Sequence, residues 1–191
     1  NISEIKKTVN FYKKKKYKKL SLLHCVSNYP CSNKSLNLNV IKTLRKTFKL
    51  PVGFSDHSEG PAAAQLAIAL GATIIEKHFT LNNKSIGPDH KASDNPKNFS
   101  SYVTYLRNAE IIIGSKIKRI QKEEKSIRKI SRKSITLKQN VIKNQTLRMK
   151  DIIMKRPGIG LIGQEIKNVI GKKFKKNFKK NYQIKYKDMY L

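Results

Sequence analysis

The stretch PVGFSDHSEGPAAAQLAIALGATIIEKHF, residues 51–79, carries the clearest indication of the fold class. VGFSDH at 52–57 and ATIIEKHF at 72–79 are short β-type runs, and the second is rich in β-branched residues. Between them, Pro61 stands where a helix would begin and Gly71 where it would stop. The spacing therefore predicts a strand, a helix and a second strand in succession.

The same alternation continues on both sides of this stretch. Upstream, LSLLHCV at 20–26 is a continuous apolar run, typical of a strand buried on both faces. Residues 36–48 repeat apolar side chains at helical spacing, residues 3–15 predict a leading helix, and Pro96 opens a further one. Three strands alternating with three helices predict an α/β fold built from successive βα units around a parallel sheet.

The chain changes character after residue 113. Residues 114–133, GSKIKRIQKEEKSIRKISRK, form a charged connector. From about residue 134 the pattern becomes short β segments and turns, beginning with SITL. We therefore predict an α/β domain over 1–113, a linker over 114–133 and a small separate domain over 134–191.

The net charge of +30 is unevenly spread. Residues 1–19 hold eight lysines against one acid and residues 165–191 hold nine against two, whereas residues 51–100 are net −1. Most basic residues are lysines beside abundant Asn and Ile, which favours a compositional drift on solvated surfaces over a nucleic-acid interface. The alternative is a basic nucleic-acid-binding module, because the tail FKKNFKKNYQIKYKDMY interleaves lysines with aromatics.

Several other classes of protein are disfavoured by composition. No run approaches the roughly 20 apolar residues of a membrane span, so no membrane partner is expected. The first residues lack an apolar signal core, which predicts a cytoplasmic protein. Cys25 and Cys31 are then expected to be reduced, and neither belongs to a Cys-x-x-Cys motif that would indicate a structural zinc site.

Three polar clusters fall at the C-terminal ends of the three predicted strands: Ser27-Asn28-Tyr29-Pro30, Ser55-Asp56-His57 and Glu76-Lys77-His78. Ligands of parallel α/β folds bind at this carboxyl edge. His57 and His78 are 21 residues apart, one βα unit. On neighbouring strands about 4.8 Å apart, their imidazoles could share one divalent metal and leave positions open for water and substrate. Each could equally be an ordinary polar residue where a strand meets solvent, and spacing alone leaves both interpretations open.

Four motifs carry a family resemblance. HCVSNYP, LPVGFSDHS, GATIIEKHFTLNNKSIGPDHKAS and KRPGIG resemble successive motifs of the sialic acid synthase family, which makes N-acetylneuraminate, legionaminate or pseudaminate. The resemblance runs from about residue 2 to residue 191 and keeps the family order. It implies that residues 1–113 are the C-terminal part of a (β/α)8 TIM barrel and that residues 134–191 form an antifreeze-like (SAF) β-rich domain.

The resemblance also implies a reaction. Phosphoenolpyruvate would condense through C3 with the aldehyde of an N-acyl-mannosamine-type amino sugar, and phosphate would leave with C–O cleavage. A divalent metal, Mn or Mg, would polarise the aldehyde. By their matching positions, His57 and His78 would bind the metal and be catalytic. Tyr29 and Asp89 would contact the sugar, with Asp89 also catalytic, and Ser55 and Ser27 would contact phosphoenolpyruvate. Arg156 would enter the partner's active site in a domain-swapped homodimer.

A complete barrel needs eight βα units, whereas the sequence supplies three and a leading helix. We therefore expect the 191 residues alone to be inactive as an enzyme, and an inactive truncated remnant is a further alternative. Two other histidines are given structural roles. His24 is predicted to be a core residue, because it lies inside an apolar strand, and His90 is predicted to be part of a loop.

Overall fold

The structure is a computed structural model that describes residues 1–17 and 19–190. The chain forms two compact units, Asn1–Lys116 and Ile117–Leu191, which we call the α/β unit and the C-terminal unit. Each unit has a hydrophobic core of its own.

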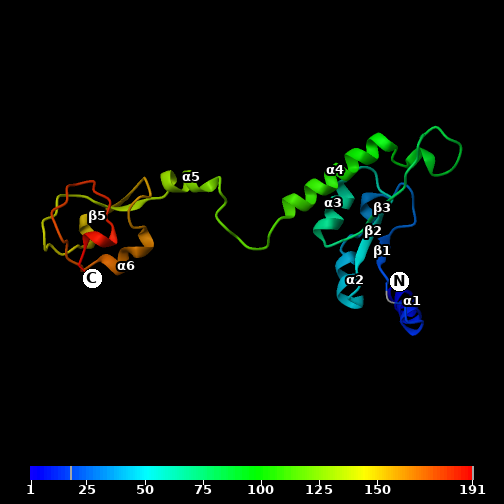
Figure 1. The fold of residues 1–191 in the computed structure, drawn as a ribbon, viewed down its shortest axis with the longest axis horizontal. Helices are drawn as coiled ribbons and strands as arrows, with labels where there is room; N and C mark the ends of the chain where they lie inside the picture. The colour runs from blue at the N-terminus through cyan, green and yellow to red at the C-terminus, as the bar shows by residue number, and fades with distance from the viewer. Residues whose placement is uncertain (18, 191) are drawn as a thin grey trace. The chain divides into compact units, whose positions relative to one another are not determined.

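The α/β unit is built on a three-stranded parallel sheet in the order β1-β2-β3 (Figure 1). The strands are β1 at Leu22–Cys25, β2 at Val52–Asp56 and β3 at Ile75–Lys77. The helices are α1 at Ile2–Lys14, α2 at Val40–Phe48, α3 at Ala62–Ala69 and α4 at Pro96–Ile113. The predicted alternation and the parallel α/β fold are therefore confirmed.

Local sequence fixes where these helices begin and end. Asn95 accepts a hydrogen bond from the backbone of Asn98 at 3.0 Å, and Pro96 occupies the first turn of α4. Pro61, predicted as the first residue of α3, is its N-cap, because the regular helix begins one residue later. Gly71 follows α3 with φ +99°, a backbone conformation that glycine tolerates best.

The core of the α/β unit lies between the sheet and its helices. Phe54 and Val52 of β2 pack with Ile41 and Leu44 of α2 and with the alanines of α3. All of β2 is buried, as expected of the central strand.

The prediction that the first strand is buried on both faces is wrong. In β1 half-buried and exposed residues alternate, and Leu23 is 36% exposed. The reason is its place at the edge of the sheet, where, within the described residues, it pairs with β2 alone. The regular strand is also shorter than the predicted range 20–26.

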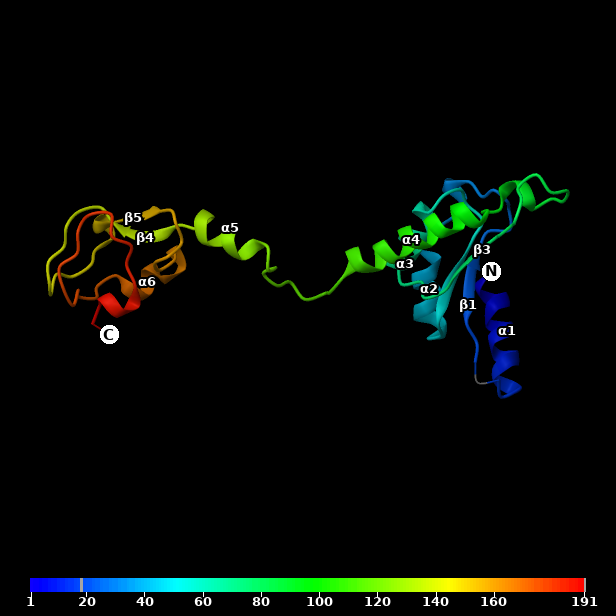
Figure 2. The same cartoon turned by 45° about the horizontal axis from the view of Figure 1, so that its top comes forward.

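The C-terminal unit is held by a short antiparallel pair, β4 at Ser134–Leu137 and β5 at Ile152–Lys155 (Figure 2). Isolated bridges tie later segments to this pair and to one another, including Thr136 to Gln183 and Val141 to Phe178. The remaining elements are α5 at Glu124–Ser131, α6 at Ile166–Val169, and the 3-10 turns η3 at Met149–Asp151, η4 at Gly163–Glu165 and η5 at Tyr186–Asp188. Helix α5 lies inside the segment predicted as a linker, and the sequence analysis did not predict it.

Two buried aspartates close equivalent turns in this unit. Asp151 accepts from the backbone of Arg148 at 2.9 Å, and Asp188 accepts from the backbone of Lys185 at 2.8 Å. Both carboxylates are almost fully buried, at 2% and 3% exposure. Each satisfies a backbone donor at the start of a 3-10 turn, as a helix cap does.

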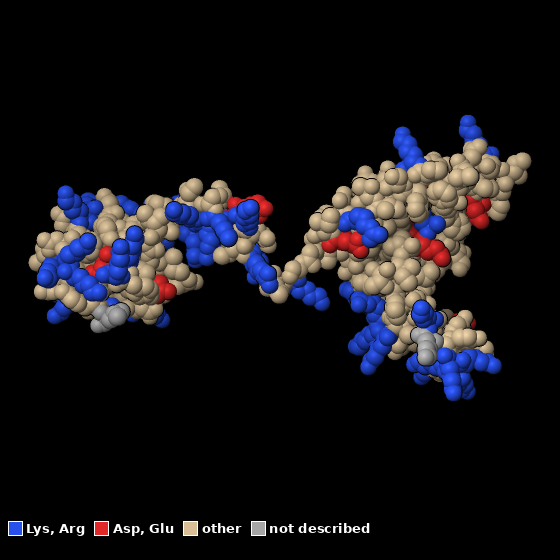
Figure 3. Space-filling model, in the orientation of Figure 1, with Lys and Arg blue, Asp and Glu red and all other residues tan. Residues whose placement is uncertain are grey.

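Lysines and arginines cover much of the visible surface of the C-terminal unit, whereas acids are more prominent on the α/β unit (Figure 3). The aromatics Phe174 and Phe178, which stand between lysines in the tail, are buried in the core at 0% and 6% exposure. In the described part of the chain, no helix is long and apolar enough to cross a membrane.

We predict that Gly53→Ala destabilises the α/β unit. The added Cβ would overlap the backbone oxygen of Ile74 and the side chain of Leu23, and would lie 2.7 Å from Ile74 Cβ. The Ile74 oxygen cannot move away, because it accepts the Phe54 amide at 2.8 Å. We expect the free energy of unfolding to fall by about 1–3 kcal/mol, as for other overpacked sites, measured by denaturant unfolding of the full-length protein. Gly163→Ala, whose Cβ would meet only ordinary contacts, is the control. Equal stability of the two variants would contradict the prediction.

We predict that Asp151→Ala destabilises the C-terminal unit. The change leaves the Arg148 amide and the Gln139 side chain without their acceptor, which Asp151 Oδ1 provides to Gln139 at 2.9 Å. Loss of a buried acceptor costs about 1–3 kcal/mol of unfolding free energy. Thermal unfolding of Asp151→Ala beside Lys150→Ala, at an exposed neighbour, tests this. An Asp151→Ala midpoint no lower than that of Lys150→Ala would refute it.

Candidate functional site

The register of the sheet sets the site. Ser55 pairs with Glu76 and Asp56 pairs with Lys77 across β2 and β3. Continuing this register by one residue puts His57 opposite His78 at the carboxyl edge. Their ring centroids are 5.0 Å apart, with the ring planes at 81°. The juxtaposition predicted from the 21-residue spacing is present in the structure.

Tyr29 joins the two histidines from the loop after β1. Its ring centroid lies 4.2 Å from that of His78 and 4.9 Å from that of His57. Its hydroxyl donates to the backbone oxygen of Ala92 at 2.8 Å. Burial, and after it the neighbouring carboxylates, raises the pKa of Tyr29 to about 12. The phenol is therefore a neutral hydrogen-bond donor near neutral pH, not a base.

The surroundings of His57 suit a metal ligand. Its Nδ1 lies 3.0 Å from the backbone oxygen of Val26. A proton on Nδ1 shared with that oxygen leaves the Nε2 lone pair free, which is the usual arrangement of a metal-binding histidine. Cys25 Sγ lies 3.8 Å from both ring nitrogens.

The two imidazoles would not saturate a metal. Within residues 1–17 and 19–190, no group of three or more His, Cys, Asp or Glu side chains is placed to hold a metal ion. Among these residues, an ion held by His57 and His78 would have coordination positions left open. Such open positions characterise a catalytic rather than a structural metal site.

Glu76 is a site residue that the sequence analysis placed in a polar cluster but gave no role. The buried Ser55 hydroxyl donates to its Oε1 at 2.6 Å. Because side chains alternate along a strand, Ser55 shares a face with His57, and Glu76 shares one with His78. The signal was in the sequence: Glu76 precedes His78 by the same two residues as Ser55 precedes His57.

Asp89 lies in the loop after β3, which hydrogen bonds bring back to the strand end. The Asp94 amide donates to the His78 oxygen at 3.0 Å, and Ser93 Oγ donates to the Asp89 oxygen at 2.6 Å. The Asp89 side chain is exposed, and its carboxylate is near enough to contribute to the raised pKa of Tyr29. The loop thus brings Asp89 to the same edge of the sheet.

The remaining predicted residues are placed as follows. Ser27 is exposed just after β1, where the register continues towards His57. Arg156 belongs to the C-terminal unit, where its Nε donates to the Ser131 oxygen at 2.8 Å. His24 is half-buried on the edge strand rather than part of the core, and its Nε2 lies 2.7 Å from the Leu36 oxygen. His90 has the predicted loop role, with Nδ1 2.7 Å from Thr80 Oγ1.

Comparison with known proteins finds relatives that are similar in sequence and in structure. The N,N'-diacetyllegionaminic acid synthase of Legionella pneumophila is 43% identical over 154 residues, which are 81% of this chain and 43% of that protein. A sialic acid synthetase of Leptospira borgpetersenii, solved with citrate, is 39% identical with a TM-score of 0.59, over 66% of this chain and 44% of the other.

A third protein is compared only for the similarity of its fold. The spore coat polysaccharide biosynthesis protein E of Chromobacterium violaceum is 23% identical, with a TM-score of 0.80, and the match covers 100% of this chain and 58% of that one.

The chain spans about half the length of the curated relatives it matches, with 43% of the first and 56% of the second covered. The NeuB family model matches residues 1–118, the segment that holds both histidines and Tyr29. The matching relatives include proteins named as an N,N'-diacetyllegionaminic acid synthase, a pseudaminic acid synthase and an N-acetylneuraminate-9-phosphate synthase. The chain therefore belongs to the NeuB family, the sialic acid synthase family that its motifs resemble.

Proposed function

We propose that the protein containing this chain condenses phosphoenolpyruvate with an N-acyl-mannosamine-type amino sugar, in the cytoplasm, to form a nonulosonic acid and phosphate. The observation that carries the proposal is the pair His57 and His78, with ring centroids 5.0 Å apart at the carboxyl edge of the sheet. Tyr29 contacts both rings, so aromatic and imidazole groups converge on one small region. Membership of the NeuB family supports the same class of reaction.

In the proposed reaction, C3 of phosphoenolpyruvate forms a bond to the aldehyde carbon of the open-chain sugar, whose oxygen gains a proton. Water adds to C2, the bond between C2 and the phosphate oxygen breaks, and inorganic phosphate leaves. A divalent metal, Mn or Mg, would supply Lewis-acid polarisation of the aldehyde when held by His57 and His78. The Val26 oxygen would keep His57 in the tautomer that presents Nε2.

The other residues of the site would bind and orient the two substrates. Ser55 is proposed to contact an oxygen of phosphoenolpyruvate, and to donate to it the hydroxyl would turn away from Glu76 Oε1, its acceptor in the structure. Ser27, at the end of the neighbouring strand, is proposed to contact the same substrate. Tyr29 and Asp89 would contact the sugar, and the exposed Asp89 carboxylate can accept from a hydroxyl or amide.

The architecture proposed for the whole protein follows the family. The α/β unit would be the C-terminal part of a (β/α)8 barrel, and the C-terminal unit an antifreeze-like (SAF) domain. Arg156 would reach the active site of the partner subunit in a domain-swapped homodimer. A guanidinium offers planar, directional donors that suit a polar acyl-amide sugar.

The alternative of a nucleic-acid-binding module has less support. Such modules stack bases on exposed aromatics beside basic groups. Here Phe174 and Phe178 are buried in the core of the C-terminal unit, so these two rings are not available to stack on bases beside the lysines of the tail. Only Tyr186 and Tyr190 of the tail are about two-fifths exposed, at 43% and 42%.

We predict that His57→Ala and His78→Ala each lower phosphate release from phosphoenolpyruvate by more than about 100-fold, because each removes a ligand of the activating ion. The assay uses the full-length protein, a panel of N-acyl amino sugars, and buffers with and without Mn²⁺. His24→Gln, which keeps a side-chain donor near the Leu36 oxygen, is the control and should retain activity within about threefold. Release that does not depend on sugar, or full activity in the double alanine variant, would refute the mechanism.

A second prediction tests the domain-swapped homodimer. His57→Ala and Arg156→Ala homodimers should each be inactive, but a mixture in which subunits exchange should regain activity. In a swapped hybrid, one site combines an intact histidine pair with an intact arginine. Random mixing therefore restores about a quarter of wild-type activity. If the mixture stays inactive although native mass spectrometry shows hybrids, Arg156 acts on its own subunit's site. An active Arg156→Ala homodimer would mean that Arg156 acts on neither site.

A further inference from the structure

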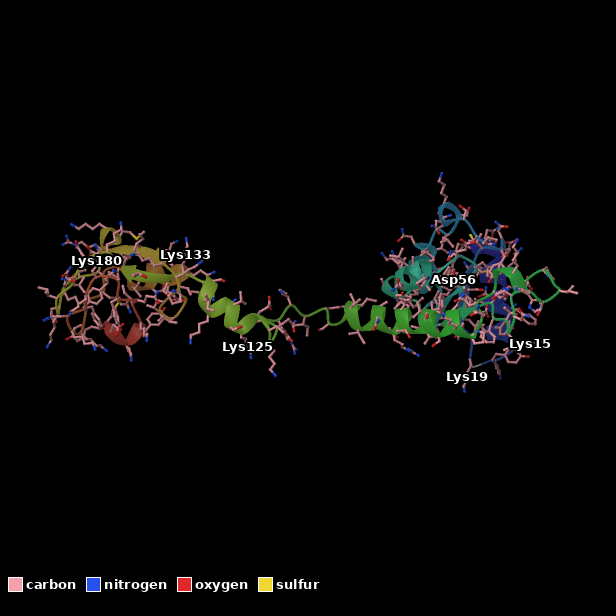
Figure 4. All side chains as sticks on the ribbon, turned by 90° about the horizontal axis from the view of Figure 1, so that it is seen from above. Lys15, Lys19, Asp56, Lys125, Lys133 and Lys180 are labelled. Atoms are coloured by element: carbon pink, nitrogen blue, oxygen red, sulfur yellow. The ribbon has the colours of Figure 1, made fainter. Side chains whose placement is uncertain are left out.

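A buried polar network lies on the face of the sheet opposite to His57 and His78. Asp56 and Lys77, each one residue before a histidine, form an ion pair with Nζ 3.5 Å from Oδ2. Their side chains are 0% and 3% exposed. Because side chains alternate along a strand, this pair points to the face opposite His57 and His78. Figure 4 shows Asp56 within the α/β unit, in contrast to the peripheral labelled lysines.

The network satisfies both oxygens of Asp56. Oδ1 accepts from the Ser58 amide at 2.8 Å and from the Ser58 hydroxyl at 2.6 Å. Oδ2 accepts from the Tyr102 hydroxyl of α4 at 2.7 Å. Lys77 also donates to the Ser58 backbone oxygen, and its Nζ lies 5.5 Å from the centre of the Tyr102 ring. The network therefore ties β2, β3 and α4 together at one point.

Stability alone does not explain a network of this kind. Removing two charges from water is costly, and a well-packed apolar pair of similar volume is often as stabilising as a buried ion pair. Its position is informative. Regular pairing ends at Asp56 and Lys77, so His57 and His78 lie one residue beyond the regular strands. The next peptides are held by loops, where the Cys31 amide donates to the His57 oxygen at 2.7 Å and the Asp94 amide to the His78 oxygen at 3.0 Å.

We propose that Asp56, Lys77 and Tyr102 are positioning residues that fix the spacing of His57 and His78 by locking the two strand ends to α4. The ion pair joins the residues preceding the histidines across the two strands. Tyr102 then anchors the pair to a helix of 18 residues. The catalytic meaning of this spacing rests on the proposed function, but the spacing itself is a property of the fold.

The test compares Tyr102→Phe with a matched control, Tyr182→Phe. Each change deletes one phenol hydroxyl that donates to a buried aspartate, Tyr182 to Asp188 Oδ2 at 3.1 Å in the C-terminal unit. Two quantities are measured on the full-length protein below its unfolding temperature. One is the dissociation constant for Mn²⁺, by electron paramagnetic resonance. The other is the metal-free NMR spectrum with ¹³C at histidine Cε1, in which the Tyr29 ring makes the His78 signal sensitive to position.

We expect Tyr102→Phe to shift the His57 and His78 signals and to weaken Mn²⁺ binding about threefold to tenfold, towards the lower end of the effect of losing a partner behind a metal ligand. Tyr182→Phe should lower the unfolding temperature but leave both readouts unchanged. If Tyr102→Phe does not fold, Ser58→Ala takes its place, because it removes only one of the bonds to Asp56 Oδ1.

Unchanged histidine signals and an unchanged Mn²⁺ dissociation constant in the folded variant would overturn the proposal, and the network would then only stabilise the fold. The metal-free spectrum separates this failure from that of the proposed function. If the unmodified protein binds no Mn²⁺, the metal-binding role proposed for the histidines is wrong. The shift of the histidine signals in Tyr102→Phe would still show whether Tyr102 positions these residues.

Discussion

The parallel register between β2 and β3 is the constraint on which the site depends. Because Asp56 is opposite Lys77, the next residues along both strands are the two histidines. A slip of one residue would turn one side chain of each pair to the other face of the sheet. The buried β2, with Phe54 and Val52 fixed in the core, makes such a slip costly. Core packing and site geometry are thus set by the same pairing.

The two faces of the sheet have different roles at these strand ends. One face carries Ser55, Glu76 and the histidines, which remain available to ligands. The other carries a charged pair held out of water against α4. A short strand such as β3, with three residues, has few ladder hydrogen bonds to hold its end. Side-chain contacts on the covered face therefore supply the rigidity that the ladder lacks.

The sequence predicted the strand–helix alternation and the approach of His57 to His78, because apolar runs, prolines and a 21-residue spacing are local signals. It did not predict the position of Tyr29 against both rings, which depends on the path of a loop and on a hydrogen bond to Ala92, 63 residues away. The role of Asp56 and Lys77 was missed for a similar reason, since their partner Tyr102 comes from a distant helix. The exposed face of β1 was missed because an apolar run does not reveal which strands lie beside it.

The two capping aspartates of the C-terminal unit have a consequence for its electrostatics. Residues 117–191 contain 23 lysines and arginines and five acids, and two of these acids, Asp151 and Asp188, are buried. The exposed surface is therefore even less compensated than the composition suggests. Self-repulsion at such a charge density opposes compaction. The small apolar core of the unit must therefore outweigh the repulsion between its surface lysines and arginines. Two of the unit's five negative charges, Asp151 and Asp188, lie in the interior beneath these basic side chains.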